Sequence, residues 1–279
     1  MIALERVRTK TAIVKSFRGD KPVERLADLM SKRRALLQAG KEPKLKVASR
    51  WAVTKKQLLR ETQGKCAYCE TNFEAAAFGD VEHYRPKSIY WWLAYVYDNY
   101  LASCAICNQQ FKSDAFEIDG GAMTGPEITA NTTDAEIETL AKEAIPDPLD
   151  QPALDAFFAD HRAEGALLLN PYLDDPDTFF GWEVLAGAKE VELIPNPAEP
   201  RAIAVVDACN RLYGLNRPQL RRRRFKQWRN YRFTVRVLED PGSDAELRDE
   251  AREMLDLLVA ADSEYAAMVR FFERARLAP

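Results

Sequence analysis

Two Cys-x-x-Cys pairs, Cys66/Cys69 and Cys104/Cys107, constrain the fold of this chain more than any other feature of its sequence. Each two-residue gap lets two thiolates of one turn face the same ion, and two such turns complete a tetrahedral sulfur site that suits zinc. Because the protein then fills all four positions around the ion, we expect this zinc to be structural. The 34 residues between Cys69 and Cys104 exceed the spacing of a simple zinc ribbon, so the sequence predicts a functional element inserted between the pairs.

The competing interpretations of the four cysteines are a redox pair and an iron–sulfur cluster, and neither explains the polar residues around the pairs. In a reducing compartment, paired cysteines at this spacing favour a metal over disulfides. The fifth cysteine, Cys209, follows the apolar stretch that begins at residue 202, where we expect it to be a small buried side chain.

Composition sets the limits of the interpretation. With 279 residues, 47% of them hydrophobic, the chain can bury a core and form one large domain or two smaller ones. A net charge of −3 means that any contact with nucleic acid has to come from local basic patches. The sequence has no apolar run long enough to span a membrane, and its first residues lack the order of a signal peptide, so we expect a cytoplasmic protein without membrane contact.

Hydrophobic spacing predicts a helical arm in the first 60 residues. Apolar side chains recur at close to helical spacing over 23–39, and Gly40 ends that run. Thr54 is a predicted N-cap for a helix over 55–61, and Gly64 is a plausible end for it.

The second half of the chain has a different pattern. Gly, Pro, Thr and Asp are frequent over 119–152, which we interpret as a connection with one short helix over 135–144. A hairpin is predicted over 182–193, turning at 186–189. Residues 201–277 predict three helices, broken near Gly214 and near 241–243.

These elements predict an α+β fold that is mainly helical. We divide it into a helical arm (1–60), a central core with the two cysteine pairs (61–118), and a mainly helical C-terminal region (119–279) that contains the hairpin and a basic helix.

The insert between the cysteine pairs contains His83, one of two histidines in the chain. Residues around it alternate and end at a proline, as in a short strand, and a neutral imidazole there can take a proton from water that attacks phosphorus. Glu82 and Asn108 supply hard oxygen ligands for Mg²⁺ or Mn²⁺. The other histidine, His161, has no such neighbours, and we do not assign it to catalysis.

This pattern resembles the HNH nuclease family, whose core has a ββα-metal fold. By that resemblance His83 is the general base, Asn99 fixes the metal loop through backbone contacts, Glu82 and Asn108 bind the catalytic ion, and Lys112 steadies the helix or contacts phosphate. The chain departs from many members by having Glu at the acidic position and Asn at the last position, which leaves the preferred metal open. The matching segments are Cys66-Ala67-Tyr68-Cys69, Val81-Glu82-His83, Asp98-Asn99-Tyr100-Leu101 and Cys104-Ala105-Ile106-Cys107-Asn108 with Lys112.

A narrower resemblance extends over residues 60 to 225, to the HNH component of Septu-type and retron-associated antiphage systems. In that family the nuclease acts beside an ATPase of the ABC/SMC-like kind, so the resemblance implies such a partner. It is carried by Cys66-Ala67-Tyr68-Cys69-Glu70, Glu82-His83-Tyr84-Arg85-Pro86-Lys87, Leu167-Leu168-Leu169-Asn170-Pro171, Asp174-Asp175-Pro176 and Tyr213-Gly214-Leu215-Asn216-Arg217.

A basic segment, 217–236, holds nine Lys or Arg residues and no acid, with aromatic residues between them. It can meet phosphates while its rings enter the core or stack on bases. The alternative is a solvated basic helix that faces the acidic stretch 147–199 or a partner. The residues that we expect to contact DNA or RNA are Arg85, Lys87, Lys112, Arg221, Arg222 and Arg224.

Two hypotheses about function follow. The first is a metal-dependent HNH endonuclease, an effector of antiphage defence that acts with an ATPase. The second is a non-catalytic, zinc-stabilised module that binds nucleic acid or protein. The discriminating observation is whether His83 and Asn108 face one site, because a pure binding module needs only the cysteines.

Overall fold

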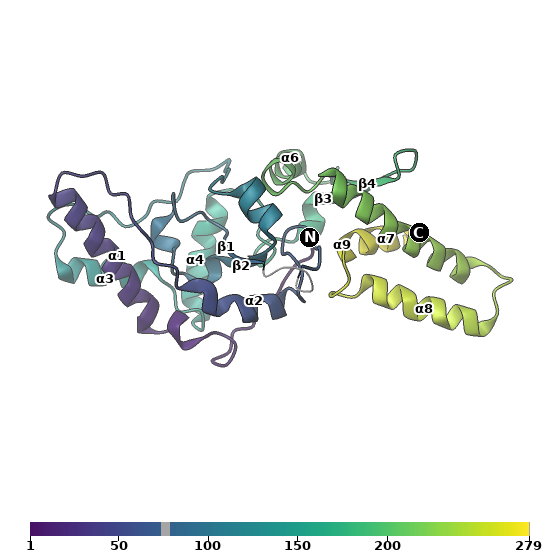
Figure 1. Ribbon diagram of the computed structural model, residues 1–279, viewed down its shortest axis with the longest axis horizontal. Helices are drawn as coiled ribbons and strands as arrows, with labels where there is room; N and C mark the ends of the chain where they lie inside the picture. The colour runs from purple at the N-terminus through teal and green to yellow at the C-terminus, as the bar shows by residue number, and fades with distance from the viewer. Residues whose placement is uncertain (74–78, 279) are drawn as a thin grey trace.

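The computed structural model describes residues 1–73 and 79–278 as an elongated α+β molecule (Figure 1). Helices α1 and α3 lie at one end, α7 and α8 lie at the other, and strands β1 and β2 lie between them. The helices and strands are α1 (Asp20–Gln38), α2 (Lys55–Glu61), β1 (Asp80–His83), β2 (Tyr100–Ser103), α3 (Asp134–Ala144), α4 (Gln151–Ala163), α5 (Pro176–Phe179), β3 (Phe180–Leu185), β4 (Glu190–Pro195), α6 (Ala202–Tyr213), α7 (Pro218–Glu239), α8 (Ala245–Val259) and α9 (Ala266–Leu277). The predicted fold class, α+β with helices as the main element, is confirmed.

Local sequence signals explain where several elements begin and end. Gly40, at φ +66°, follows the end of α1, where Lys41 N donates to Leu36 O over 2.9 Å. A capping box formed by Thr133 and Glu136 begins α3. The predicted hairpin is present as β3 and β4, which pair antiparallel.

Three local predictions are wrong. The hydroxyl of Thr54 does not cap α2, because it donates to Trp51 O over 2.7 Å. The strand before Pro86 ends earlier than expected, at His83. The last segment forms four helices, because the chain also breaks at 260–265, where buried Tyr265 takes φ +59° without a nearby Gly or Pro.

Two hydrophobic clusters form the core. The smaller one joins α1 to α3 through Leu26, Met30 and Ile137, and it includes rings from the aromatic segment 90–96. Those rings pack against α1 and α3. The larger cluster contains three of the paired cysteines with residues from β2, the hairpin and helices α6 to α9. Both clusters draw on more than one of the three predicted domains, whose boundaries stay a prediction.

The central strands position the candidate site. β1 and β2 are antiparallel, with His83 opposite Tyr100 and Asp80 opposite Ser103. After β2 the chain passes through Cys104 into a short π-helical segment, Ile106–Lys112. The order is therefore strand, strand and helical segment, and the second cysteine pair spans the junction between β2 and that segment.

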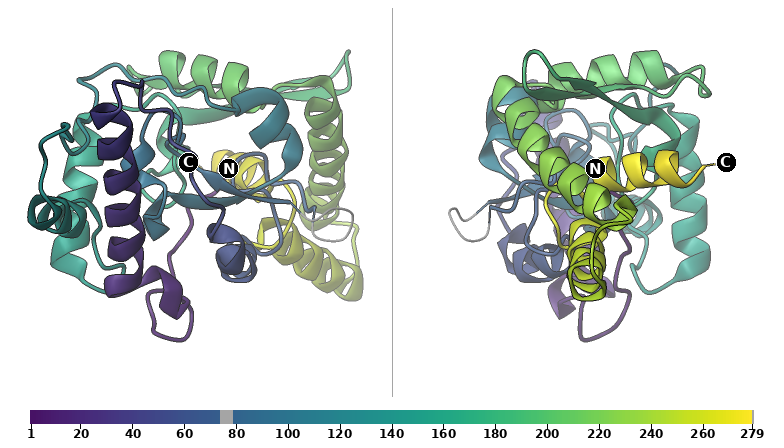
Figure 2. Two further views of the ribbon diagram at one scale, coloured as in Figure 1. Left: turned by 60° about the vertical axis from the view of Figure 1, so that its left-hand side comes forward. Right: turned by 90° about the vertical axis from the view of Figure 1, so that its right-hand side faces the viewer.

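At the opposite end, α6, α7 and α9 pack against the β3–β4 hairpin. The hairpin runs beside α6 and α7, and α8 packs along α7 (Figure 2). Gly214 ends α6 at φ +63°, where any Cβ would lie 2.5 Å from the ring of Phe111. Only glycine suits this close turn, which brings the start of α7 next to the cysteine pairs.

Candidate functional site

The first cysteine pair lies in a tight turn beside β2. Cys66 N donates to Thr71 O over 3.0 Å, and Glu70 adopts φ +60° to close the turn. Ala67 N donates to Ala102 O of β2 over 2.9 Å. This bond fixes the first pair against the strand that leads into the second pair.

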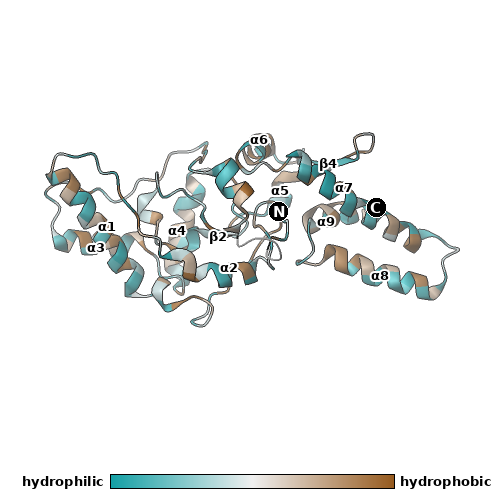
Figure 3. Cartoon of the chain, viewed as in Figure 1, coloured by the Kyte–Doolittle hydropathy of each residue, from teal (hydrophilic) through white to brown (hydrophobic). Residues whose placement is uncertain are grey.

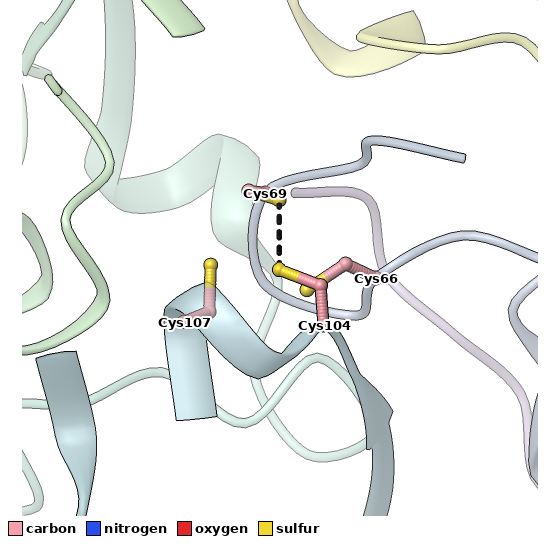
Figure 4. A group of neighbouring side chains, drawn as sticks. All are labelled: Cys66, Cys69, Cys104 and Cys107. Atoms are coloured by element: carbon pink, nitrogen blue, oxygen red, sulfur yellow. Dashed lines mark hydrogen bonds between the residues drawn. The ribbon is translucent and has the colours of Figure 1, made fainter. Parts of the chain in front are cut away.

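The four sulfur atoms of Cys66, Cys69, Cys104 and Cys107 lie within 4.8 Å of one another. The side chains of the two turns point toward a common centre, and Cys69 Sγ lies 4.0 Å from Cys104 Sγ (Figure 4). Four thiolates at about 2.3 Å from a zinc ion would lie about 3.8 Å apart, so this donor set fits zinc. In the parts of the chain that the structure describes, it is the only group of three or more Cys, His, Asp or Glu residues placed to hold a metal.

Arg217, which precedes α7, completes this cysteine cluster from outside. Its guanidinium lies 3.4 Å from Cys107 Sγ and 3.6 Å from Cys69 Sγ. Burial alone would lower the pKa of Arg217, but the charges of Cys107 and Cys69 outweigh it and raise that pKa. The cation therefore offsets part of the negative charge of four thiolates. Nothing in the local sequence of Arg217 indicates a contact with sulfur.

A polar pocket of about 380 Å³ lies beside the cluster and brings together His83, Glu82 and Asn108. We call it the β1 pocket. Its other lining residues include Asp80, which alternates with Glu82 along β1, together with Trp51, Lys87 and Asp114. Asp80 and Asp114 are not among the site residues predicted from the sequence, although Asp80 stands at the start of the strand that carries His83.

His83 is buried and held in one orientation. Its Nε2 lies 3.1 Å from Ala94 O, and Trp51 and Tyr100 meet its ring edge-on, with ring centroids 4.5 Å and 5.0 Å away. Since a carbonyl oxygen only accepts, Nε2 carries the proton in the neutral ring and Nδ1 keeps its lone pair. Burial lowers the pKa of His83 to about 3 against the hydrogen bond to Ala94, and Lys87 and Lys112 lower it further. The imidazole is thus neutral near pH 7, with Nδ1 as its proton acceptor.

Glu82 is buried against a cation. Lys112 Nζ lies 2.5 Å from Glu82 Oε1 and also donates to His83 O over 3.0 Å. Burial raises the pKa of Glu82, while Lys112 opposes that shift. Lys112 therefore ties the helical segment to β1 and holds the carboxylate that was expected to bind a catalytic ion.

Asn108 faces Asp80, an acid that is not among the site residues predicted from the sequence. Its Nδ2 donates to Asp80 Oδ2 over 3.1 Å, and Gln109 Nε2 donates to the same oxygen over 2.9 Å. With Glu82, these side chains provide carboxylate and amide oxygens in one pocket, which is the donor chemistry that Mg²⁺ and Mn²⁺ prefer.

Asn99 anchors the loop that leaves β1. Its Oδ1 accepts from Arg85 N over 2.8 Å, and its Nδ2 donates to Arg85 O over 3.0 Å and to Leu93 O over 3.3 Å. The Asn99 side chain therefore bonds to backbone groups at both ends of the loop, and it does not line the pocket.

Arg85 and His161 belong to a buried polar cluster with Glu164. Arg85 donates to Glu164 Oε2 over 2.7 Å, and its Nη1 lies 2.5 Å from His161 Nδ1. Tyr90 also donates to Glu164, over 2.5 Å. Burial lowers the pKa of His161 to about 2, and Arg85 lowers it further. The cluster fastens the loop after β1 to α4.

Three residues of the predicted nucleic acid interface are buried. Arg85, Lys112 and Arg224 are each at most 2% exposed, and a buried cation cannot meet a phosphate in this conformation. Arg221 is paired with Glu190 and, at 3.6 Å, with Glu192, as expected for a basic helix that faces the acidic stretch. Two predicted residues keep accessible charge: Lys87 at the β1 pocket and Arg222, whose side chain is 63% exposed.

Comparison with known proteins gives a partial match. Septu protein PtuB of Bacillus mycoides (strain KBAB4) is 35% identical over 78 residues, which are 23% of this chain and 26% of that protein. The chain therefore spans about a quarter of the length of this curated relative. No family model matches the sequence, and no solved structure matches the fold.

Within the described residues, none of the helices combines the length and the apolar character needed to cross a lipid bilayer.

Proposed function

We propose that this chain is a metal-dependent HNH endonuclease, stabilised by a structural zinc, that hydrolyses phosphodiester bonds in DNA or RNA. The observation that carries the proposal is the β1 pocket, where a neutral histidine lies with three acids and Asn108 beside the four-cysteine cluster. The chain order of two antiparallel strands and a helical segment, with the cysteines at its base, supports a ββα-metal core.

The residues of the pocket divide the chemistry among them. Nδ1 of His83 accepts the proton of the attacking water, while its Nε2–H bond to Ala94 keeps the ring in place. A pKa of about 3 makes the ring a weak base in the free protein. The negative charge of a bound phosphate would raise this pKa toward the range where a general base is most effective. Lys87, at the pocket, attracts that phosphate.

The catalytic ion would be held by Glu82 and Asn108, with Asp80 as a further oxygen donor. Mg²⁺ or Mn²⁺ at this position would supply positive charge to the phosphate and to the leaving oxygen. To reach such an ion, Glu82 has to share its carboxylate with Lys112, and the amide of Asn108 has to present its oxygen.

The partial likeness to Septu protein PtuB supports a place in antiphage defence. We infer that the nuclease then acts with an ATPase partner of the ABC/SMC-like kind, in the cytoplasm, and that the partner delivers or releases its activity.

The test compares cleavage by the wild type and His83→Ala. Supercoiled plasmid, circular single-stranded DNA and a folded RNA are incubated with Mg²⁺ or Mn²⁺, with and without the co-expressed ATPase. Loss of the general base should slow cleavage by about 10²- to 10⁴-fold while zinc content and melting temperature stay unchanged. The matched control is His161→Gln, which alters the other buried histidine, outside the pocket. Equal cleavage by His83→Ala and the wild type sinks the proposal.

A second function, a non-catalytic zinc-stabilised binding module, is favoured by one observation. Lys112 forms an ion pair with Glu82, so the charge of this carboxylate is already balanced without a metal. Under this alternative the wild type binds nucleic acid or a protein partner but leaves all three substrates intact with either ion, whether or not the ATPase is present.

A further inference from the structure

We propose that the groove between α7 and the β3–β4 turn binds single-stranded nucleic acid, and that it holds the strand for the site proposed above. The groove has a volume of about 870 Å³ and shares no lining residue with the β1 pocket. Its cations and rings are Lys189, Arg222, Lys226, Arg229, Phe225 and Phe233. This inference rests on the proposed nuclease function only for the fate of the strand, not for its binding.

The charge of the groove selects the ligand. Four cations and no acid line it, although the chain as a whole carries a net charge of −3. The nearest acid in contact with a groove cation is Glu190, 3.8 Å from Arg222, and Arg221 already holds that carboxylate. Within the described residues, Lys226 and Arg229 have no ion pair. Such an excess of positive charge in a hollow fits a chain of phosphates.

The aromatic residues select a single strand over a duplex. Phe233 is 70% exposed, an unusual position for a ring that could have been buried. Phe225 is partly buried, with its ring 5.4 Å from that of Trp228, which anchors it. Unpaired bases stack on exposed rings, whereas the bases of a duplex are already stacked on each other. Hydrophilic residues dominate the first part of α7, as Figure 3 shows.

The geometry of α7 fixes the groove relative to the catalytic residues. Arg217, just before the helix, contacts Cys107 and Cys69, and Asn108 of the β1 pocket directly follows Cys107. At a rise of about 1.5 Å per residue, Lys226 lies about 14 Å and Phe233 about 24 Å along the axis from Arg217. One rigid helix therefore ties the groove to the cysteine cluster, and the groove acts on substrate affinity, not on bond cleavage.

An acidic surface of a protein partner is the other occupant that such charge could attract. The exposed rings favour the nucleic acid, because a row of phosphates with free bases matches both the cations and the aromatic faces. The experiment separates the two by measuring each binding event directly.

Binding is measured by fluorescence anisotropy without added divalent ion, with a labelled 20-nucleotide oligothymidine and a duplex of the same length. We expect Lys226→Gln/Arg229→Gln to weaken oligothymidine binding and to reduce the slope of log Kd against log salt by about 1.4. Phe233→Leu, which keeps an apolar side chain but removes the flat ring, should weaken binding of the single strand by about fivefold or more and spare the duplex.

The matched control is Lys142→Gln/Arg232→Gln, the same change of charge at exposed helix residues outside the groove. It should bind as the wild type does. Wild-type binding by the groove variants, or no binding of oligothymidine by the wild type, overturns the proposal. So does a groove variant that keeps nucleic acid but no longer co-purifies with the ATPase.

The outcome is independent of the nuclease test. If the wild type binds through the groove but never cuts, the groove stands and the proposed function fails. If it cuts while the groove variants bind normally, the reverse holds. If both are right, the groove variants should raise KM for a single-stranded substrate and leave kcat unchanged.

Discussion

At the scale of single residues, the contacts that matter most are those made by side chains with no local sequence signal. Arg217 shows this, because its role depends on two sulfur atoms that are 110 and 148 residues away in the chain. Removing its charge should destabilise a bound zinc, since groups around metal ligands commonly change metal affinity by about 10- to 100-fold.

We therefore expect Arg217→Gln to lower zinc affinity by about that factor, measured by competition with a coloured chelator. Arg221→Gln is the control, because Arg221 lies one turn further along and pairs with Glu190 on the hairpin. Equal zinc affinity in Arg217→Gln and the wild type would show that the guanidinium does not support the site.

His161 predicts how stability depends on pH. Its pKa falls from an unfolded value near 6.5 to about 2 in the fold, so the folded chain binds fewer protons below pH 6.5. The stability that this histidine contributes is present above pH 6.5 and is lost as the pH falls toward 2. Between pH 6.5 and 5 the loss is about 2 kcal/mol.

His161→Gln should remove this part of the pH dependence, because glutamine can still accept a hydrogen bond from Arg85 but does not titrate. The measurement is the free energy of unfolding in urea at pH 7.5, 6.5, 5.5 and 5. His83, whose pKa is also lowered, remains in both chains, so the difference between them isolates His161. Parallel curves would contradict the assignment.

At the scale of elements, the two turns that carry the cysteines should form only with their metal. Cys104→Ser removes one of four ligands at the junction between β2 and the helical segment, and metal binding is coupled to folding in such sites. We expect loss of zinc and a large fall in melting temperature. Cys209→Ser is the control, because Cys209 does not belong to the cysteine cluster. Its Sγ lies 3.6 Å from Leu167 O, and a serine hydroxyl can donate to the same carbonyl. A similar small effect of both variants would rule out a structural cysteine site.

How far the sequence predicts these elements depends on how local their causes are. Gly40, Gly214 and the hairpin turn are predicted well, because glycine conformation and alternation act over a few residues. The break before Tyr265 is not, since it depends on a buried tyrosine whose hydroxyl lies 3.1 Å from Thr71 Oγ1. Thr54 stands where an N-cap is predicted, but its hydroxyl donates to Trp51 O. The residue types around it do not predict which of the two bonds forms.

The candidate site follows the same rule. Motif spacing brings His83, Glu82 and Asn108 to one pocket, and it also places the four cysteines together. It does not reveal Asp80 as the partner of Asn108, or that Lys112 and Arg85 are buried cations, because those facts depend on packing between segments.

At the scale of the whole molecule, separate regions are proposed to have separate tasks. The cysteine cluster holds the centre, the β1 pocket is proposed to cut, and the groove on α7 is proposed to bind the strand. The smaller hydrophobic cluster of α1 and α3 contains the aromatic side chains of segment 90–96. It therefore supports the loop that ends at β2.

Two metals are proposed to have separate tasks in this protein, a closed zinc for structure and an open ion for cutting. The measurement is cleavage by protein that has been dialysed against metal-free buffer and assayed for zinc beforehand, with and without the proposed ATPase partner. The dialysed protein should keep its zinc, fail to cut, and regain cleavage when Mg²⁺ or Mn²⁺ is added. Cleavage that continues with zinc alone would contradict this proposal.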